Sequence, residues 1–180
     1  MSALRPPRPL LMPTYHGHVS SAKEALILIE ACLSGQLSHA STPPLSSVQD
    51  EVVSSGNVFV YEEFSSGIRE WKDGREWGPP SHVGGLEVAP LRPPTQINGI
   101  SPASMYKSTT KIDYRAHTHH LVAYFSISDA LGGTLLKPSF DPALANVVIR
   151  RALNVQRSIS EADERALEIY LQGVAAQPSP

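Results

Sequence analysis

The sequence of 180 residues contains a single cysteine, Cys32. An intrachain disulfide is therefore impossible, which favours an intracellular protein over a secreted one. No apolar run approaches the roughly 20 residues that a membrane-spanning helix needs. The proline-rich first residues are not typical of a signal peptide. We therefore expect a protein with no membrane partner.

Positive charge is also scarce. The chain has 15 Lys+Arg against 17 Asp+Glu, and residues 10–140 hold 9 against 12, a net charge of −3. Domains that hold phosphates by bulk charge are usually basic, so any nucleic-acid site here must be a local patch. The chain also lacks a nucleophile elbow, a phosphate-binding glycine loop and a zinc-protease helix, so its motifs indicate no enzyme and no cofactor.

The patterns that are present predict an α+β fold with one antiparallel sheet. Helices are expected from the N-cap Ser21 to Leu33, where Ser21 and Glu24 suggest a capping box, and at 47–54. Strands are expected at 57–61, 104–113 and 118–127. Residues 78–103 are expected to form a proline-rich connection with one short strand near Leu86–Val88. A disordered tail is expected at 1–12. A C-terminal extension, 141–180, is expected to hold helices at 142–156 and 160–173.

Residues 67–77, GIREWKDGREW, hold both tryptophans of the chain, Trp71 and Trp77. The Asp-Gly dipeptide between them predicts a β-hairpin turn. Aromatic rings beside basic residues suit nucleic acid or a membrane surface. The alternative is a tight turn whose tryptophans pack on the sheet and whose charges are solvated. The basic residues are Arg69, Lys72 and Arg75.

A second basic pattern lies in the strand predicted at 104–113. Lys107, Lys111 and Arg115 are spaced by four residues, which places them on one face of a single strand. Such a stripe can follow a phosphate backbone. The alternatives are a solvated outer face, or a hairpin turn that begins before Arg115 and breaks the stripe.

Two further segments have a functional and a structural interpretation. His117 and His119 share a strand face and can supply two metal ligands, but no third ligand stands at a recognisable spacing, so polar strand residues are the simpler interpretation. The loop at 13–18, PTYHGH, precedes a helix N-terminus and suits phosphate, or else it only positions the helix. No metal site is predicted.

Taken together, three segments resemble the WOPR-domain family of fungal transcription regulators of morphological switching and development. They are PTYHGHVSSAKEALILIEACLSGQL, SGNVFVYEEFSSGIREWKDGREW and HHLVAYFSISDALGGTL, and the match covers roughly residues 13–138.

The resemblance implies that two segments, about 13–90 and 103–140, interleave their strands in one domain, 13–140, around a variable linker at about 78–103. It implies sequence-specific binding of double-stranded DNA, in the nucleus, without catalysis. Trp71 and Trp77 are expected to support the hairpin. The residues expected to contact DNA are Thr14, His16, Arg69, Lys72, Arg75, Lys107 and Lys111.

Several positions depart from the family pattern. Glu70 stands where the family has a basic residue, Lys72 where it has Ser or Thr, and 78–82 lacks the usual arginine. A protein that makes fewer phosphate contacts has a lower affinity for DNA. The alternative function is a divergent relative that acts through protein contacts or self-association by residues 141–173. Its candidate apolar surface comprises Leu144, Val147, Val148, Leu167, Ile169 and Leu171.

Overall fold

The computed structural model describes residues 11–92, 104–156 and 160–176. The predicted tail at 1–12 and the end of the linker therefore fall almost entirely outside the described residues. The strands are β1 (Tyr15–His16), β2 (Asn57–Glu62), β3 (Ser81–Val83), β4 (Leu86–Pro90), β5 (Met105–Tyr114) and β6 (His117–Ser126). The α-helices are α1 (Ala22–Leu33), α2 (Gln49–Val52), α3 (Glu63–Ser66), α4 (Ile127–Gly132), α5 (Arg151–Asn154) and α6 (Glu161–Ala175), and three 3₁₀ turns lie at Ser46–Val48, Pro138–Phe140 and Pro142–Leu144.

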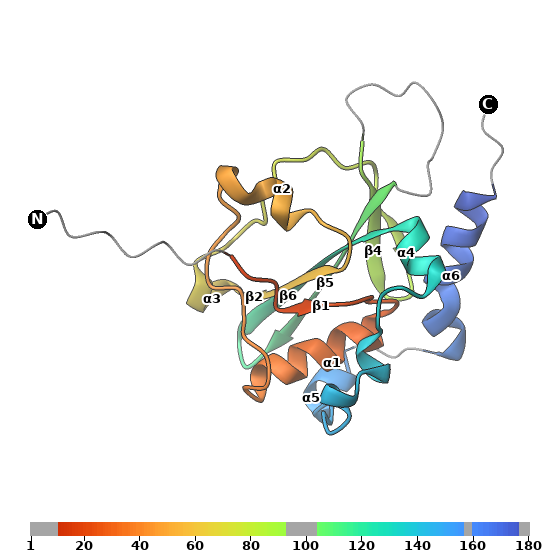
Figure 1. The fold of residues 1–180 in the computed structure, drawn as a ribbon. Helices are drawn as coiled ribbons and strands as arrows, with labels where there is room; N and C mark the ends of the chain where they lie inside the picture. The colour runs from red at the N-terminus through yellow and green to blue at the C-terminus, as the bar shows by residue number, and fades with distance from the viewer. Residues whose placement is uncertain (1–10, 93–103, 157–159, 177–180) are drawn as a thin grey trace, which may run out of the picture.

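The six strands form one antiparallel sheet in the order β1-β2-β6-β5-β4-β3. The β5–β6 hairpin from the second predicted segment occupies the centre, and strands of the first segment flank it on both sides (Figure 1). The predicted interleaving of the two segments is therefore confirmed. Neither segment has a complete sheet by itself, because β2 needs β6 and β4 needs β5 for their inner hydrogen bonds.

Side chains alternate between two faces of this sheet, as they must in extended strands. On the helix face, Val58, Val60, Tyr106, Leu121 and Phe125 pack with α1 in the larger core. The opposite face is called the loop face because residues 67–78 cover it. Its smaller core contains Phe59, Tyr61, Ile68, Val122 and Tyr124.

Helix α1 forms where the apolar run predicted it, and it is buried along most of its length. Ser21 is the N-cap residue, but its hydroxyl makes no capping hydrogen bond. The predicted capping box is wrong because Glu24 turns away from the helix end and accepts hydrogen bonds from the backbone N–H and hydroxyl of Ser139. The Glu24 carboxylate thereby holds the 3₁₀ turn Pro138–Phe140 against α1.

The turn between β5 and β6 consists of Arg115 and Ala116, which have φ angles of 50° and 62°. Two successive positive φ angles define the type of two-residue turn that matches the twist of a hairpin. Arg115 therefore leaves the strand, and the predicted basic stripe ends at Lys111. The proline-rich linker contains the short strand expected near Leu86–Val88, as β4, and also a second strand, β3, which pairs with it.

The segment after residue 140 packs on the same helix-face core as the rest of the chain. Leu144, Leu153, Leu167 and Leu171 are at most 6% exposed. Three of the six residues predicted to offer a surface for association are therefore internal: Leu144, Leu167 and Leu171. Val148 and Ile169 are exposed, at 81% and 64%. Helix α6 begins with the predicted N-cap Ser160, whose hydroxyl and Asp163 form a capping box.

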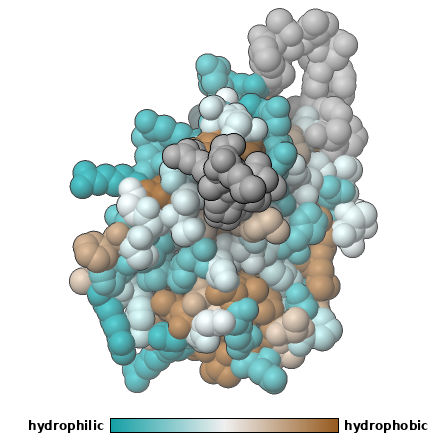
Figure 2. Space-filling model, turned by 60° about the vertical axis from the view of Figure 1, so that its left-hand side comes forward, coloured by the Kyte–Doolittle hydropathy of each residue, from teal (hydrophilic) through white to brown (hydrophobic). Residues whose placement is uncertain are grey.

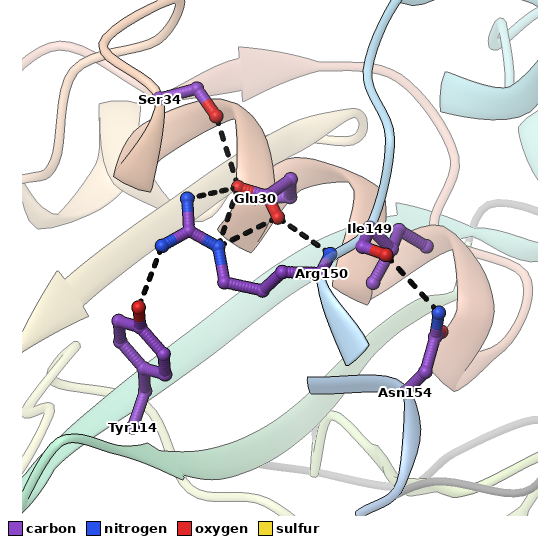
Figure 3. Close-up of polar contacts among 6 residues, drawn as sticks. All are labelled: Glu30, Ser34, Tyr114, Ile149, Arg150 and Asn154. Atoms are coloured by element: carbon purple, nitrogen blue, oxygen red, sulfur yellow. Dashed lines mark hydrogen bonds and ion pairs between the residues drawn. The ribbon is translucent and has the colours of Figure 1, made fainter. Parts of the chain in front are cut away.

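The continuous helix predicted at 142–156 does not form, because an ion pair holds its centre in an extended conformation. Glu30, 2% exposed on α1, accepts hydrogen bonds from the backbone N–H and the guanidinium of Arg150 (Figure 3). Arg150 has φ −64° and ψ 148°, outside the helical region. Its guanidinium also donates to the Tyr114 hydroxyl at 2.8 Å. One arginine thus joins the C-terminal segment to α1 and to the end of β5.

Glu30 stays ionised in this environment. Burial alone raises the pKa of its carboxyl, but hydrogen bonds from Arg150 and Ser34 hold the pKa below its ordinary value. Because its charge is shielded from water, the pair contributes to folding only while both partners are present.

None of the described helices is long and apolar enough to cross a membrane.

Replacing Arg150 tests this attachment. Arg150→Met is expected to lower the free energy of unfolding by about 3 kcal/mol, because it leaves a buried carboxylate without its partner. The measurement is urea unfolding at neutral pH, with Arg151→Met, an exposed neighbour, as the control. In a Glu30→Gln background, Arg150→Met should be much less harmful. An equal loss in both backgrounds would contradict the role of the ion pair.

Candidate nucleic-acid interface

Residues 67–78 cross the loop face of the sheet as an irregular segment. The predicted β-hairpin at 68–77 is wrong, since neither Ile68–Trp71 nor Arg75–Trp77 pairs as a strand with the other. Its only ladder contact among the described residues is an isolated bridge between Trp77 and Leu91. The Asp-Gly turn does form, with Gly74 at φ 73°. Packing on the sheet, rather than strand pairing, fixes the course of this segment.

The side chain of Asp73 anchors the segment to the sheet. The residue is 4% exposed, and its carboxylate accepts hydrogen bonds from the Tyr124 hydroxyl at 2.7 Å and from the Trp77 indole N–H at 3.1 Å. It also accepts from the Arg75 backbone N–H at 3.1 Å and lies 3.3 Å from the Lys107 ammonium. One carboxylate therefore connects the loop to β5 and β6.

These contacts decide which groups are charged. Burial alone raises the pKa of the Asp73 carboxyl, but the hydrogen bonds from Tyr124 and Trp77 and the charge of Lys107 hold it below its ordinary value. Burial and the neighbouring carboxylate raise the pKa of the Tyr124 hydroxyl. Asp73 is therefore ionised and Tyr124 is a neutral donor at physiological pH.

Both tryptophans pack against the sheet, in positions that suit the supporting role expected for them. The Trp71 ring stacks on Tyr61, with centroids 5.4 Å apart, and its N–H donates to the Tyr124 hydroxyl at 2.9 Å. Trp77 lies beneath the Lys107 ammonium, which is 4.7 Å from the ring centroid. The two rings fill the space between the loop and the sheet, and their polar edges are used internally.

The basic residues of the loop differ in how they are held. Arg69 and Lys72 are exposed, and Lys72 lies 4.0 Å from Glu70. Arg75 is less exposed, and its guanidinium donates to the Asp50 carboxylate of α2. The loop therefore presents cations to solvent with carboxylates directly beside them.

The two lysines of β5 share the loop face, as predicted, but their surroundings differ. The Lys107 side chain is only 18% exposed and is paired with Asp73, so it supports the loop. Lys111 is exposed and lines a groove of 530 Å³ whose residues come from β3, β4, β5 and β6. His82, Glu87, Thr109 and His120 are among the other residues of this groove.

The two residues of the N-terminal loop that were predicted to contact DNA differ in exposure. Thr14 is 8% exposed, and its hydroxyl accepts a hydrogen bond from the Val60 N–H at 3.0 Å, which secures the sheet edge beside β1. The structure therefore removes Thr14 from the surface. His16 is exposed and lies next to Asn57. Of these two predicted contacts, only His16 is exposed.

The histidines of β6 have separate partners. His117 lies 3.0 Å from Glu62, and His120 lies 2.6 Å from Glu63 and stacks on Tyr61. His119 is buried beside His39. Within the described ranges, no three side chains of the metal-binding types come together in a way that suits an ion.

Polar and apolar residues lie on different parts of the surface. Figure 2, which brings the left-hand side of Figure 1 forward, shows mainly hydrophilic residues at the height of α2 and α3. Hydrophobic residues gather lower on the same face, at the height of α1 and α5. The loop itself presents exposed charges of both signs, from Arg69, Glu70, Lys72 and Glu76.

Sequence reasoning missed the two acids that organise these cations. The sequence indicates Asp73 only as a turn residue, and Asp50 only as part of a short helix. The signal for Asp73 is weak, because an Asp-Gly pair predicts a turn wherever the aspartate side chain points. No pattern in the sequence connects Asp50 to Arg75, since 25 positions separate them.

Behind the N-terminal loop, His18 is buried at 5% exposure with its ring edge against Phe125. Its Nδ1 has no hydrogen-bond partner in the described part of the chain. Burial, with a contribution from the charge of Lys137, lowers the pKa of His18 to about 4. The ring is therefore neutral at physiological pH.

Comparison with known proteins gives a consistent result. The family model described as the Gti1/Pac2 family matches residues 14–88. The global transcription regulator sge1 of Gibberella fujikuroi is 31% identical over 227 residues, which cover 92% of this chain and 68% of that protein. The sge1 regulator of Fusarium oxysporum is 29% identical, with 91% and 68% covered.

A solved structure is similar over most of the fold. It is a complex of the WOPR domain of Wor1 in Candida albicans with 13-base-pair double-stranded DNA. The TM-score is 0.69 at 31% identity, and the match covers 83% of this chain and 99% of that one. A match over 83% of the chain therefore extends beyond the 14–88 segment.

Removing the Asp73 carboxylate is expected to destabilise the fold. Asp73→Ala should lower the free energy of unfolding by about 3 kcal/mol, because it leaves Lys107 and the Tyr124 hydroxyl without their partner in a poorly hydrated place. Urea unfolding followed by tryptophan fluorescence measures it. Glu76→Ala, an exposed carboxylate of the same loop, is the control and should change the value by about 0.5 kcal/mol or less. Equal effects of the two variants would show that Asp73 is not an anchor.

Stability should also depend on pH through His18. The folded-state pKa lies below the ordinary value of about 6.5, so the unfolded chain binds the proton first as the pH falls. The contribution of His18 to the free energy of unfolding is expected to be fully present above pH 6.5. It should decrease by about 3 kcal/mol as the pH falls to 4. Urea midpoints at several pH values should fall less steeply for His18→Leu than for the parent, whereas exposed His82→Gln should follow the parent. Parallel curves for His18→Leu and the parent would reject the assignment.

Proposed function

The chain belongs to the Gti1/Pac2 family, and on that premise we propose that it is a transcription regulator that binds specific sequences of double-stranded DNA. Its role is the control of fungal development and morphology, and its site of action is the nucleus. The observation that carries the proposal is the likeness, over 83% of this chain, to a WOPR domain solved with DNA. The related proteins are named as regulators rather than enzymes, which supports a non-catalytic role.

The loop face supplies the chemistry for such a contact. Arg69, Lys72 and Arg75 lie on a segment that Asp73 and the two tryptophans hold against the sheet. A rigid loop contacts DNA with a smaller loss of conformational entropy than a mobile one. Arginine binds a guanine edge or a phosphate with two hydrogen bonds, whereas lysine provides a point charge.

Burial narrows the set of contacts that the resemblance implied. We assign Arg69, Lys72, Arg75, Lys111 and His16 to the DNA surface, because all five reach solvent. Thr14 and Lys107 take structural roles in this proposal, because their polar groups are directed into the protein. The lysine of β5 that braces the loop is thereby separated from the lysine that lies at the surface.

The alternative function, through protein contacts of residues 141–173, has less support. Three of its six apolar side chains lie in the core, and the relatives are named as transcription regulators. The charge of the DNA surface is small for its class, so binding should show a shallow salt dependence compared with a strongly basic domain.

Arg69→Ala tests the proposed surface. The change should weaken binding to a duplex of random sequence about fivefold and should reduce the slope of log affinity against log salt by about one, as expected when one phosphate contact is removed. Fluorescence anisotropy at several salt concentrations measures both quantities. Arg165→Ala on α6, which removes the same charge far from the loop face, should leave both unchanged.

Two results would contradict the proposal. One is a parent protein that shows no binding to random or AT-rich duplexes at low salt, up to tens of micromolar protein. The other is an equal drop in affinity for Arg69→Ala and Arg165→Ala, which would place the DNA elsewhere on the molecule.

A further inference from the structure

A short acidic helix lies directly against the cationic loop. Helix α2 contains Gln49, Asp50 and Glu51, and the Asp50 carboxylate accepts a hydrogen bond from the Arg75 guanidinium. The Gln49 side chain lies against the same turn, because a Cβ atom on Gly74 would collide with its amide group. Helix α2 therefore touches the loop through two neighbouring side chains, those of Gln49 and Asp50.

Two of the ion pairs that involve the loop differ in character. The pair of Lys107 with Asp73 is internal, with side chains 18% and 3% exposed. The pair of Arg75 with Asp50 is open to water, with side chains 33% and 91% exposed. Exposed ion pairs contribute little to stability, so another anion can displace Asp50. An anion that displaced Asp73 would have to enter a buried site.

We propose that Asp50 is an intramolecular competitor that occupies Arg75 in the free protein and is displaced when Arg75 binds a DNA phosphate. This inference rests on the proposed function. The carboxylate stands in for phosphate, since both are oxyanions that a guanidinium binds with paired hydrogen bonds. Binding of Arg75 to DNA then exchanges one ion pair for another.

The consequence is a reduced affinity for duplexes of any sequence. Binding that ignores sequence comes almost wholly from phosphate contacts, so a contact that first breaks an internal pair adds less to it. The displaced carboxylate also remains beside the DNA and repels it. Asp50 thereby lowers the non-specific part of the affinity for DNA.

The experiment compares two isosteric changes on the same helix. Asp50→Asn and Glu51→Gln each remove one negative charge from an exposed position of α2, but only Asp50 is paired with Arg75. Full-length proteins are titrated against a fluorescent duplex of random sequence, about 20 base pairs long, at salt concentrations from about 50 to 200 mM. Both changes are repeated in an Arg75→Gln background. Circular dichroism confirms that each variant is folded.

The expected result is that Asp50→Asn binds about two- to fivefold more tightly than Glu51→Gln, which reports general repulsion only. In the Arg75→Gln background, this difference should disappear. Equal gains from the two changes, or a difference that persists without Arg75, would overturn the inference while leaving DNA binding intact. If the parent and all variants fail to bind the duplex, the proposed function fails and the inference fails with it.

Discussion

The buried carboxylate of Asp73 is the interaction on which the proposed DNA surface depends. It lies between a loop of the first segment and strands β5 and β6 of the second, and it accepts hydrogen bonds from donors on each. An ionised group in such a place is stable only when its hydrogen bonds are satisfied. The donors Tyr124, Trp77 and Lys107 meet that need. The position of the cationic loop is therefore coupled to the correct assembly of the sheet beneath it.

The sheet adds a second constraint, because its centre and its flanks come from distant parts of the chain. β2 pairs with β6 and β4 pairs with β5. The sheet surface on which the loop at 67–78 packs therefore forms only when the two segments pair. The C-terminal segment closes the opposite face, where Arg150 joins Glu30 to Tyr114. Asp73 and Glu30 lie on opposite faces of the sheet and act in the same way. Each is a buried carboxylate that accepts hydrogen bonds from donors of another segment.

The sequence allowed the prediction of elements whose cause is local. The apolar run of α1, the strands β2, β5 and β6 and the N-cap Ser160 all follow from patterns within a few residues. The interleaving of the two segments came from the family resemblance. Errors arose where a side chain serves a distant partner. Glu24 left its helix to bind Ser139, Arg150 interrupted a predicted helix to reach Glu30, and the Asp73 turn packed on Tyr124 instead of opening a hairpin. No local pattern contains these partners.

The same limit explains why counting cations did not define the candidate site. Lys107 and Arg75 are equal in a charge count, yet the acid that holds Lys107 is buried and the acid that holds Arg75 faces water. A phosphate can replace only the second acid, because water already surrounds it and the exchange leaves no charge unpaired in the interior. A surface with a small net charge can therefore still bind a polyanion, provided that its ion pairs are exchangeable. The burial of each carboxylate, rather than the number of lysines and arginines, separates residues that hold the loop from residues that are available to DNA.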